Sequence, residues 1–390
     1  MLKKENLIEY LIILLPIISF VSLLCYRNVM ADQLVLVFEF IVMLFMALMR
    51  FQCMKKTILL VLVFNIISIA GTLLFHSGIG VGLNLLCVIM ACLLFNNVVL
   101  HESEYKIMHG ITAFLLSVYV FTLDKTYVYG GDVYDFFGND LNVNTWGMLT
   151  LAAALHWSCF IDCLKRKKQK KKEKNLLTFL EIIVIVAFGY QIYLSESRTS
   201  LIVLCLFVIW NLVKKKPLQY KNYKKTAVFI LLASVIFPFF YLYLYGIVSD
   251  ITVLGKGLFT GRQIVWGSVI QEIMKYPFLG SGNDLLISTI QHSFTQSSHN
   301  MLLGVMKAFG IIPTVTIIFF LVNRADRGIP VCAKKTAQIA LLTSLLCAFF
   351  ESFIMDSHLY MFFVLFLLNN IKMEKGAATF EETVKQETIH

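Results

Sequence analysis

The sequence predicts an all-α integral membrane protein with about twelve transmembrane helices. The 390 residues are 58% hydrophobic and only 15% charged, and the mean hydropathy is +0.76. Soluble domains are about 45–50% apolar and about 25% charged, so a soluble enzyme, a nucleic-acid regulator and a disordered scaffold are all disfavoured. The apolar runs are continuous, which excludes an outer-membrane barrel, because barrel strands alternate polar and apolar residues.

Twelve segments approach the length of about 20 mostly apolar residues that a spanning helix needs. They are 7–25, 34–49, 57–75, 83–100, 107–123, 146–164, 176–194, 200–213, 226–246, 301–321, 336–355 and 358–371. The segments 200–213 and 358–371 are short and would need flanking residues or a thinner local bilayer. Residues 1–373 are thus expected to form a single membrane domain, followed by a polar cytoplasmic tail over 374–390.

The basic residues orient these spans, because cytoplasmic loops carry an excess of Lys and Arg. A cytoplasmic N-terminus leaves most of the 34 Lys and Arg residues inside and one, Lys307, within a span. The outside then receives only Arg27, Lys125, Arg198, Lys256, Arg262 and Lys275. Both termini are therefore expected to be cytoplasmic.

The densest basic run, 165–174, is interpreted as a solvated cytoplasmic loop that touches anionic lipid headgroups. No aromatic residues interleave it, so no nucleic-acid partner is expected. The nine cysteines show no zinc-ligand spacing and are expected to be buried thiols.

Two outer loops stand out by their length, 124–145 and 247–300. The first is rich in Tyr, Asp and Asn, including Asp135 and Asn144. Aromatic rings stack on sugar faces, and carboxylates and amides bind hydroxyl groups, so this loop is either a carbohydrate-binding segment or a plain turn-rich connection. The second loop contains Trp266 and is expected to fold, with a helix across 262–274.

Two arginines on the outer side are candidates for binding a phosphate. Arg198 follows Glu196 in a tight reversal between two spans, and Arg262 follows Gly261. A guanidinium binds phosphate through a bidentate fork and stays protonated. Snorkelling, or a link between Arg198 and Glu196, is the alternative explanation for the first arginine, but its outer position runs against the bias of basic residues towards the cytoplasm.

Further candidates lie along the second outer loop and the span after it. The Gly280-Ser281-Gly282 turn could offer backbone amides to an anion, although such a turn is common. Ser and Asn in 297–300 are natural helix N-caps, whereas His299 adds a group that exchanges protons near neutral pH. Lys307, eight residues beyond His299, is either functional or snorkels outward. Glu39, Glu181 and Glu351 also lie in spans, where they could pair with other polar groups.

The motifs together resemble the core of Wzy-type polysaccharide polymerases and O-antigen ligases. They are Ser197-Arg198-Thr199, the Gly-Arg-x-x-x-Trp start at 261–266, Pro-x-x-Gly-x-Gly at 277–282, and His299-Asn300-x-x-Leu303 with Gly310. The resemblance covers about 189–311, roughly a third of the chain. Asn142-Val143-Asn144 is weakly similar to an Asn-bearing loop motif of this family.

The resemblance implies a glycosyltransferase of GT-C-like helical architecture that needs no metal or other cofactor. Its substrates would be glycans on undecaprenyl pyrophosphate at the outer face of a bacterial cytoplasmic membrane. Arg198 and Arg262 would hold the pyrophosphate, and His299 would be essential.

The residues themselves are compatible with this chemistry. Breaking a sugar–pyrophosphate bond builds negative charge, and the sequence has no Asp-x-Asp pair to hold a metal, so cationic side chains are needed. His299 is the best-placed general base, with Glu196 and Asp284 as rivals. The expected substrate contacts are Asn300, Lys307, Asp284, Trp266, Glu196, Asp135 and Asn144.

The leading hypothesis is therefore an inverting polysaccharide polymerase that joins two lipid-linked glycans, and a chain-length regulator is a possible partner. A ligase that transfers the glycan to another acceptor shares the same motifs. A lipid-linked oligosaccharide flippase is the alternative of another class. Transporters often contain internal repeats and broken helices at the membrane midplane, and no convincing repeat is visible in this sequence.

Overall fold

A computed structural model describes the fold at residues 4–50, 63, 67, 70, 79–124, 132–135, 140–167, 170–248, 252–253, 256–257, 262–282, 286–288, 293–295, 299–322, 331–351 and 356–372. Helices dominate this part of the chain, and its strands form only short two-stranded pairs. The helical membrane architecture predicted from composition is confirmed.

Six helices among the described residues are long and apolar enough to cross a membrane. They are α1 (Lys4–Cys25), α2 (Val29–Arg50), α5 (Glu102–Thr122), α6 (Val143–Lys167), α7 (Lys171–Leu194) and α9 (Tyr220–Val248), and each contains most of one predicted span. Pro16 and Pro238 lie inside α1 and α9 without ending them. Transmembrane helices tolerate proline because neighbouring groups and local adjustments satisfy the freed carbonyl.

Two shorter apolar helices match predicted spans as well. They are α4 (Ile79–Asn97) and α8 (Arg198–Val213). Of the predicted span 57–75, the structure describes only residues 63, 67 and 70, which are helical.

The single span predicted over 301–321 is wrong, because the structure breaks it at Gly310. Helix α11 (Met301–Phe309) ends there, and α12 (Ile311–Val322) starts immediately afterwards. Gly310 has a φ of 85°, and a Cβ at this position would lie 2.0 Å from the carbonyl oxygen of Phe278. Only glycine permits both this backbone conformation and this close approach of another segment.

The last two predicted spans are also shorter than expected. Helix α13 (Lys335–Cys347) ends well before residue 355, and 358–371 holds only α14 (Tyr360–Val364), the 3₁₀ turn η3 (Leu365–Leu367) and the start of strand β8 (Asn370–Lys372). Almost every side chain of 359–371 is buried against the protein. Irregular backbone is tolerated at membrane depth when protein covers it, so an apolar run here does not require a spanning helix.

Four antiparallel strand pairs join the helices at their ends. They are β1 (Asp132–Tyr134) with β2 (Asp140–Asn142), β3 (Thr252–Val253) with β4 (Lys256–Gly257), β5 (Leu286–Ser288) with β6 (Ser293–Thr295), and β7 (Val331–Ala333) with β8. Helix α10 (Arg262–Lys275) precedes β5 and confirms the helix predicted across 262–274.

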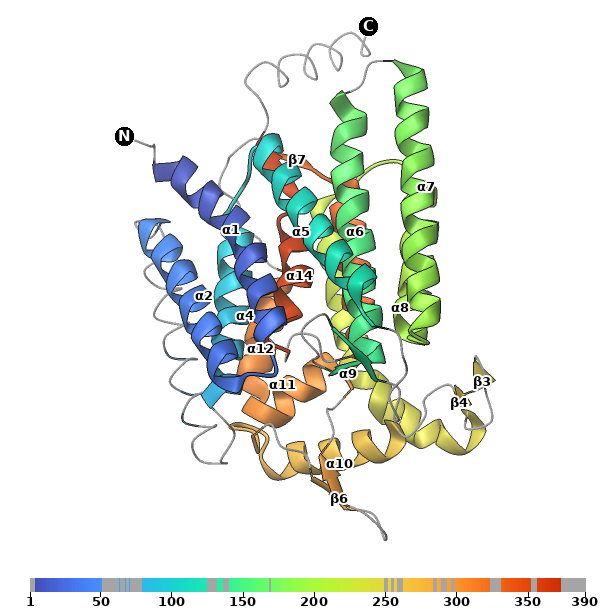
Figure 1. The fold of residues 1–390 in the computed structure, drawn as a ribbon. Coiled ribbons are helices and arrows are strands. Elements are labelled where there is room, and N and C mark those ends of the chain that lie inside the picture. The colour runs from blue at the N-terminus through green and yellow to red at the C-terminus, as the bar shows by residue number, and fades with distance from the viewer. Residues whose placement is uncertain are drawn as a thin grey trace, which may run out of the picture.

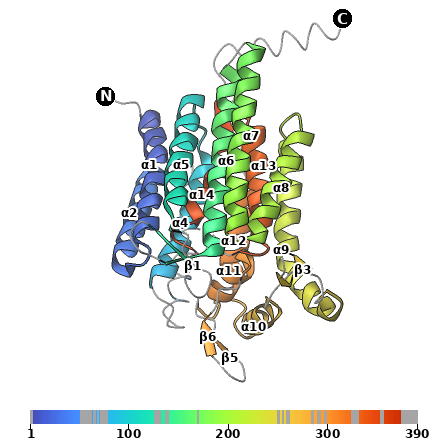
Figure 2. The same cartoon turned by 45° about the vertical axis from the view of Figure 1, so that its right-hand side comes forward.

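The helices form an elongated bundle with two distinct ends (Figures 1 and 2). Helix α6 is mostly buried and packs between α5 and α7, whereas α7 is mostly exposed. One end, below in Figure 1, carries α10 and β3–β6; we call it the α10 end. The opposite end, where α6 connects to α7 and β7 lies, is called the α7 end. The segments of the long predicted outer loop therefore gather at a single end of the bundle.

Candidate functional site

Arg262 opens α10 and points at the turn that follows α13. Its Nη2 donates to the carbonyl oxygen of Phe350 at 3.2 Å and lies 3.3 Å from a carboxylate oxygen of Glu351. The guanidinium carbon is 5.6 Å from the centroid of the Phe350 ring, within the range of a cation–π contact. The side chain is only 12% exposed. Helix α10 thus places a largely buried cation at this end of the bundle.

Trp266 holds α10 in this position. It lies one helical turn after Arg262, is fully buried, and meets Phe237 and Tyr241 of α9 edge to face, with ring centroids 6.1 and 5.4 Å apart. Such pairs add to the stabilisation from burial. The structure therefore gives Trp266 a packing role, and its predicted contact with substrate stays a prediction.

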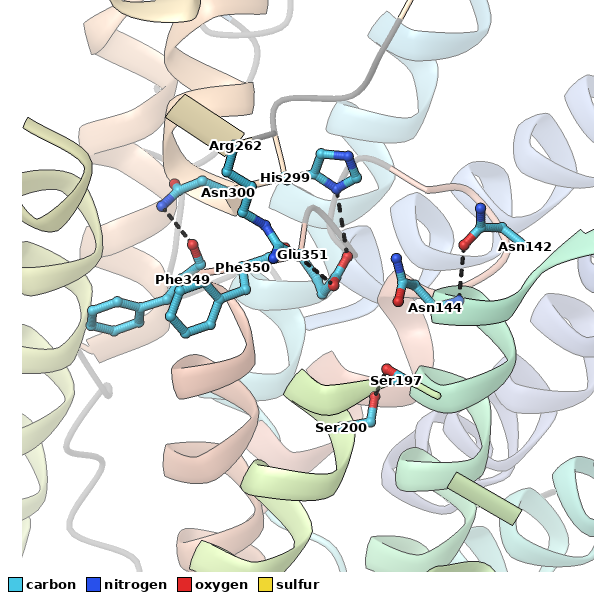
Figure 3. A network of polar contacts seen from close by, with 10 residues as sticks. All are labelled: Asn142, Asn144, Ser197, Ser200, Arg262, His299, Asn300, Phe349, Phe350 and Glu351. Atoms are coloured by element: carbon cyan, nitrogen blue, oxygen red, sulfur yellow. Dashed lines mark hydrogen bonds and ion pairs between the residues drawn. The ribbon is translucent and has the colours of Figure 1, made fainter. Parts of the chain in front are cut away.

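His299 approaches the same turn from another direction. Its Nδ1 lies 3.9 Å from the second carboxylate oxygen of Glu351, and its side chain is 22% exposed. Figure 3 shows His299 and Arg262, from different segments, both pointing at Glu351. His299 has a φ of 46°, an uncommon conformation for a residue with a side chain.

Asn300 fixes the backbone beside His299. Its side-chain oxygen accepts a hydrogen bond from the amide of Leu303 at 2.9 Å and so caps α11. Its amide nitrogen donates to the carbonyl oxygens of Ser234 in α9, at 2.8 Å, and of Phe349, at 3.1 Å. One buried side chain thus ties α9, α11 and the turn after α13 together. This explains the Asn at 300 structurally and leaves its predicted contact with substrate untested.

Arg198 is the first residue of α8, after a tight reversal from α7. Glu196 in this reversal has a φ of 53°, and its amide donates to the carbonyl oxygen of Tyr193 at 3.0 Å. Arg198 is partly desolvated, repelled by the charge of Arg262 and attracted by that of Glu196. The two arginines predicted to bind phosphate therefore lie within electrostatic reach of each other.

The start of α6 lies against this reversal. A Cβ added to Gly147 would come 2.2 Å from the Cβ of Ser197, so only glycine lets α6 approach so closely. The amide of Asn144 donates to the side-chain oxygen of Asn142 at 2.8 Å at the start of the helix (Figure 3). The predicted sugar contact Asn144 is therefore on an element that packs beside Arg198.

Asp135, the other candidate from the first loop, is 4% exposed. Its carboxylate accepts a hydrogen bond from the hydroxyl of Tyr119 at 3.3 Å. This contact joins the β1–β2 segment to α5, and the predicted contact of Asp135 with sugar is not tested by it.

The Gly280–Gly282 turn does not present the amides that the sequence suggested for an anion. The amides of Ser281 and Gly282 donate to the carbonyl oxygens of Lys307 and Ala308, at 2.7 and 3.2 Å. The turn therefore satisfies the orphan carbonyls at the end of α11. Lys307 completes this contact, because its buried ammonium donates to the carbonyl oxygen of Gly282 at 2.8 Å. Its predicted role in substrate binding remains a prediction.

One rival for the general base, Asp284, lies outside the described residues. Within the part of the chain that the structure describes, no group of three or more His, Cys, Asp or Glu side chains is placed to hold a metal ion.

Glu351 was not singled out from the sequence as a site residue, because it was assigned to the span 336–355. The structure ends α13 at Cys347 and puts Glu351 in the following turn, where its amide donates to the carbonyl oxygen of Cys347 at 3.1 Å. The available signal was the acid itself, since ionisable residues in apolar segments are functional candidates by default.

The geometry thus joins Arg198, Arg262 and His299 at the α10 end, and comparison with known proteins points the same way. The family model described as O-antigen ligase matches residues 182–320. The resemblance to the O-antigen ligase and polymerase superfamily is confirmed over this segment. It contains all three residues and supports a glycosyl-transfer function of the ligase or polymerase type in a membrane protein. No curated protein and no solved structure matches the chain.

Proposed function

We propose that this protein is a polysaccharide polymerase. It transfers a growing glycan from undecaprenyl pyrophosphate to the sugar of a new lipid-linked repeat unit, with inversion at the anomeric carbon. The supporting observation is the gathering of Arg198, Arg262 and His299 at one end of the bundle, from three separate elements.

The two arginines suit the donor's pyrophosphate. Arg198 and Arg262 are close enough to repel each other electrostatically, and a pyrophosphate that binds both would relieve this repulsion. As the bond between sugar and pyrophosphate breaks, negative charge grows on the leaving oxygen. Preformed cationic donors stabilise such charge without reorganisation.

His299 completes the transfer as general base. The acceptor hydroxyl attacks the anomeric carbon from the face opposite the pyrophosphate, a carbon–oxygen bond forms, and the bond to the pyrophosphate breaks. The hydroxyl proton passes to an imidazole nitrogen of His299. With its side chain 22% exposed, His299 can be reached by an acceptor.

The α10 end would face the outside of the bacterial cytoplasmic membrane, with both chain termini in the cytoplasm. The lipid-linked donor and acceptor would reach it from the bilayer, and a chain-length regulator would act as partner. Glu196, Asn144 and Asp135, all at this end, are the proposed contacts to the glycan.

Deletion of the gene tests the proposal, with the surface glycan separated on a gel. A cell that lacks a polymerase makes glycan of a single repeat unit. Full-length glycan retained on its lipid carrier would instead identify the protein as a ligase. An unchanged glycan profile would contradict both functions.

A further inference from the structure

Glu351 is the link between the two sides of the candidate site. One carboxylate oxygen lies 3.3 Å from Nη2 of Arg262, and the other lies 3.9 Å from Nδ1 of His299. The Glu351 side chain is 5% exposed, so water screens these contacts weakly. Glu351 also lies outside the segment that matches the O-antigen ligase family model.

We propose that Glu351 is a positioning residue that couples binding of the donor pyrophosphate to the alignment of His299. Before the donor binds, the carboxylate is the counter-ion of Arg262. When the pyrophosphate replaces the carboxylate on the guanidinium of Arg262, the Glu351 side chain moves towards His299 and interacts with its imidazole. This inference rests on the proposed function.

The contact between Arg262 and Glu351 has the features of an exchangeable one. A single nitrogen of the guanidinium, Nη2, contacts the carboxylate, and the 3.3 Å distance exceeds the usual 2.7–2.9 Å of a charged hydrogen bond. The buried Nε of Arg262 makes no hydrogen bond to any described residue. An unsatisfied buried donor is energetically costly. A ligand that accepts hydrogen bonds from both Nε and Nη2 therefore makes one hydrogen bond that the carboxylate does not make.

The protein holds the guanidinium in place through this exchange. The carbonyl oxygen of Phe350 accepts from Nη2, and the Phe350 ring lies against the guanidinium. Neither contact involves the charge of Glu351. Arg262 can therefore keep its position when a phosphate replaces the carboxylate.

The distance between the Glu351 carboxylate and His299 can shorten to that of a hydrogen bond. At 3.9 Å, the approach of Nδ1 to the carboxylate is an ion-pair distance and not a hydrogen bond. A shift of about 1 Å brings the two atoms into hydrogen-bond range. A carboxylate that accepts from Nδ1–H fixes the tautomer in which Nε2 is free to take the acceptor's proton. The same carboxylate then stabilises the imidazolium that forms.

A purely structural role predicts a different outcome. If Glu351 served only to hold Arg262 in place, its replacement would loosen Arg262, and pyrophosphate affinity and turnover would fall together. Under the coupling role the two quantities move in opposite directions, because the carboxylate competes with the pyrophosphate and assists His299.

The test is Glu351→Gln, which keeps the size of the side chain and an oxygen for Arg262 but removes the charge. Two quantities are measured on purified protein in detergent. These are the dissociation constant for inorganic pyrophosphate by calorimetry and the turnover of lipid-linked repeat units on a gel. We expect the dissociation constant to fall about fivefold to tenfold, because one nearby negative charge is gone. We expect turnover to fall about 10–100-fold, part of the contribution of an aligned base.

Two further variants control the experiment. Glu351→Asp keeps the charge, so its pyrophosphate affinity should stay near that of the wild type and part of the turnover should return. Glu102→Gln removes a carboxylate that pairs with Lys334 at the α7 end, and both quantities should stay unchanged. The amount and elution volume of each variant in detergent report its folding.

The inference is overturned if Glu351→Gln weakens pyrophosphate binding and turnover together, or changes neither, while the wild type is active. An outcome of another kind, in which the wild-type protein neither binds pyrophosphate nor extends lipid-linked repeats, would remove the proposed function and the inference with it.

Discussion

The two ends of the bundle use charge in different ways. At the α7 end each of three lysines faces a carboxylate from another element: Lys165 contacts Glu181, Lys334 lies 2.7 Å from Glu102, and Lys372 lies 2.7 Å from Glu9. At the α10 end Arg262 and His299 share Glu351, at 3.3 and 3.9 Å, and Arg262 repels Arg198.

This difference distinguishes ion pairs that stabilise the fold, at the α7 end, from cationic side chains that could bind an anionic ligand, at the α10 end. A short ion pair, such as those at 2.7 Å, gains from fixed geometry and joins two segments. A contact of 3.3 Å, such as that between Arg262 and Glu351, is weaker and less fixed in geometry. Among the described residues, the contacts of Arg262 and His299 with Glu351 at the α10 end are thus longer than the ion pairs at the α7 end, and an anionic substrate would add negative charge beside these cations.

The largest expected contrast is access from outside the cell. In a cysteine-free variant, Lys275→Cys at the α10 end should react with an impermeant thiol reagent in whole cells, whereas Lys170→Cys should not. Both positions are exposed, so access depends on the side of the membrane alone. Labelling is read by mass shift, and lysed cells provide the control in which both should react. Labelling of position 170 in intact cells would reverse the proposed orientation.

Loss of the imidazole at 299 should have the next largest effect. His299→Gln and His299→Asn should lower turnover of lipid-linked repeats by about 10²–10⁴, the usual contribution of a general base. Asn also tolerates the positive φ at this position. His101→Gln, at an exposed histidine that contacts Lys372 at the α7 end, is the matched control and should keep full turnover. Normal polymerisation by His299→Gln would move the base to Glu196 or Asp284.

The arginines should come third. Arg198→Ala and Arg262→Ala should each lower turnover by about 10²–10³, the scale for one charge-stabilising donor. Lys in either place should recover part of this loss, because it keeps the charge without the bidentate fork. Arg166→Ala is the control, since Arg166 pairs with Asp162 within α6. Equal turnover in all three alanine variants would contradict the contrast between the two ends.

The smallest expected effect concerns pH and Asp356, in the turn before α14. Burial, with the negative charge of Glu351 added, raises the pKa of Asp356 from 3.8 to about 7. Between about pH 4 and about pH 7 the folded state therefore holds a proton that the unfolded state has lost. Stability should decline as pH rises through this window and level off above it. Thermal unfolding in detergent should show this slope in the wild type and a weaker slope in Asp356→Asn.

Hydropathy predicted the long helices well because burial in lipid requires a continuous apolar run with all its backbone bonds satisfied internally. Hydropathy did not predict the structure of apolar segments that are surrounded by protein and not by lipid. The run 358–371 is as apolar as a span but lies inside the bundle, where a short helix, a 3₁₀ turn and a strand satisfy the backbone. Hydropathy also missed the break at Gly310 within the predicted span 301–321, because the φ of Gly310 depends on the approach of the distant Phe278 segment.

The candidate site was predictable where the residue type alone suggested the chemistry. Arg198, Arg262 and His299 could be selected because outer cations are scarce and a histidine can exchange protons. The place of Glu351 could not be predicted, because it depends on where α13 ends and on a contact across 89 positions of sequence. Nor does spacing reveal that Asn300 and Trp266 are held by α9.

Among the described residues, positive φ without glycine occurs at Glu196 and His299, and both belong to the candidate site. A left-handed backbone costs a residue with a Cβ about 1–2 kcal/mol, which glycine would avoid. Selection for stability alone would thus favour glycine at both positions. His299→Gly should accordingly be the more heat-resistant protein and an inactive one. The thermostability of a purified variant is then a poor guide to its activity in the cell. The more stable variant at position 299 would be the one that lacks the imidazole.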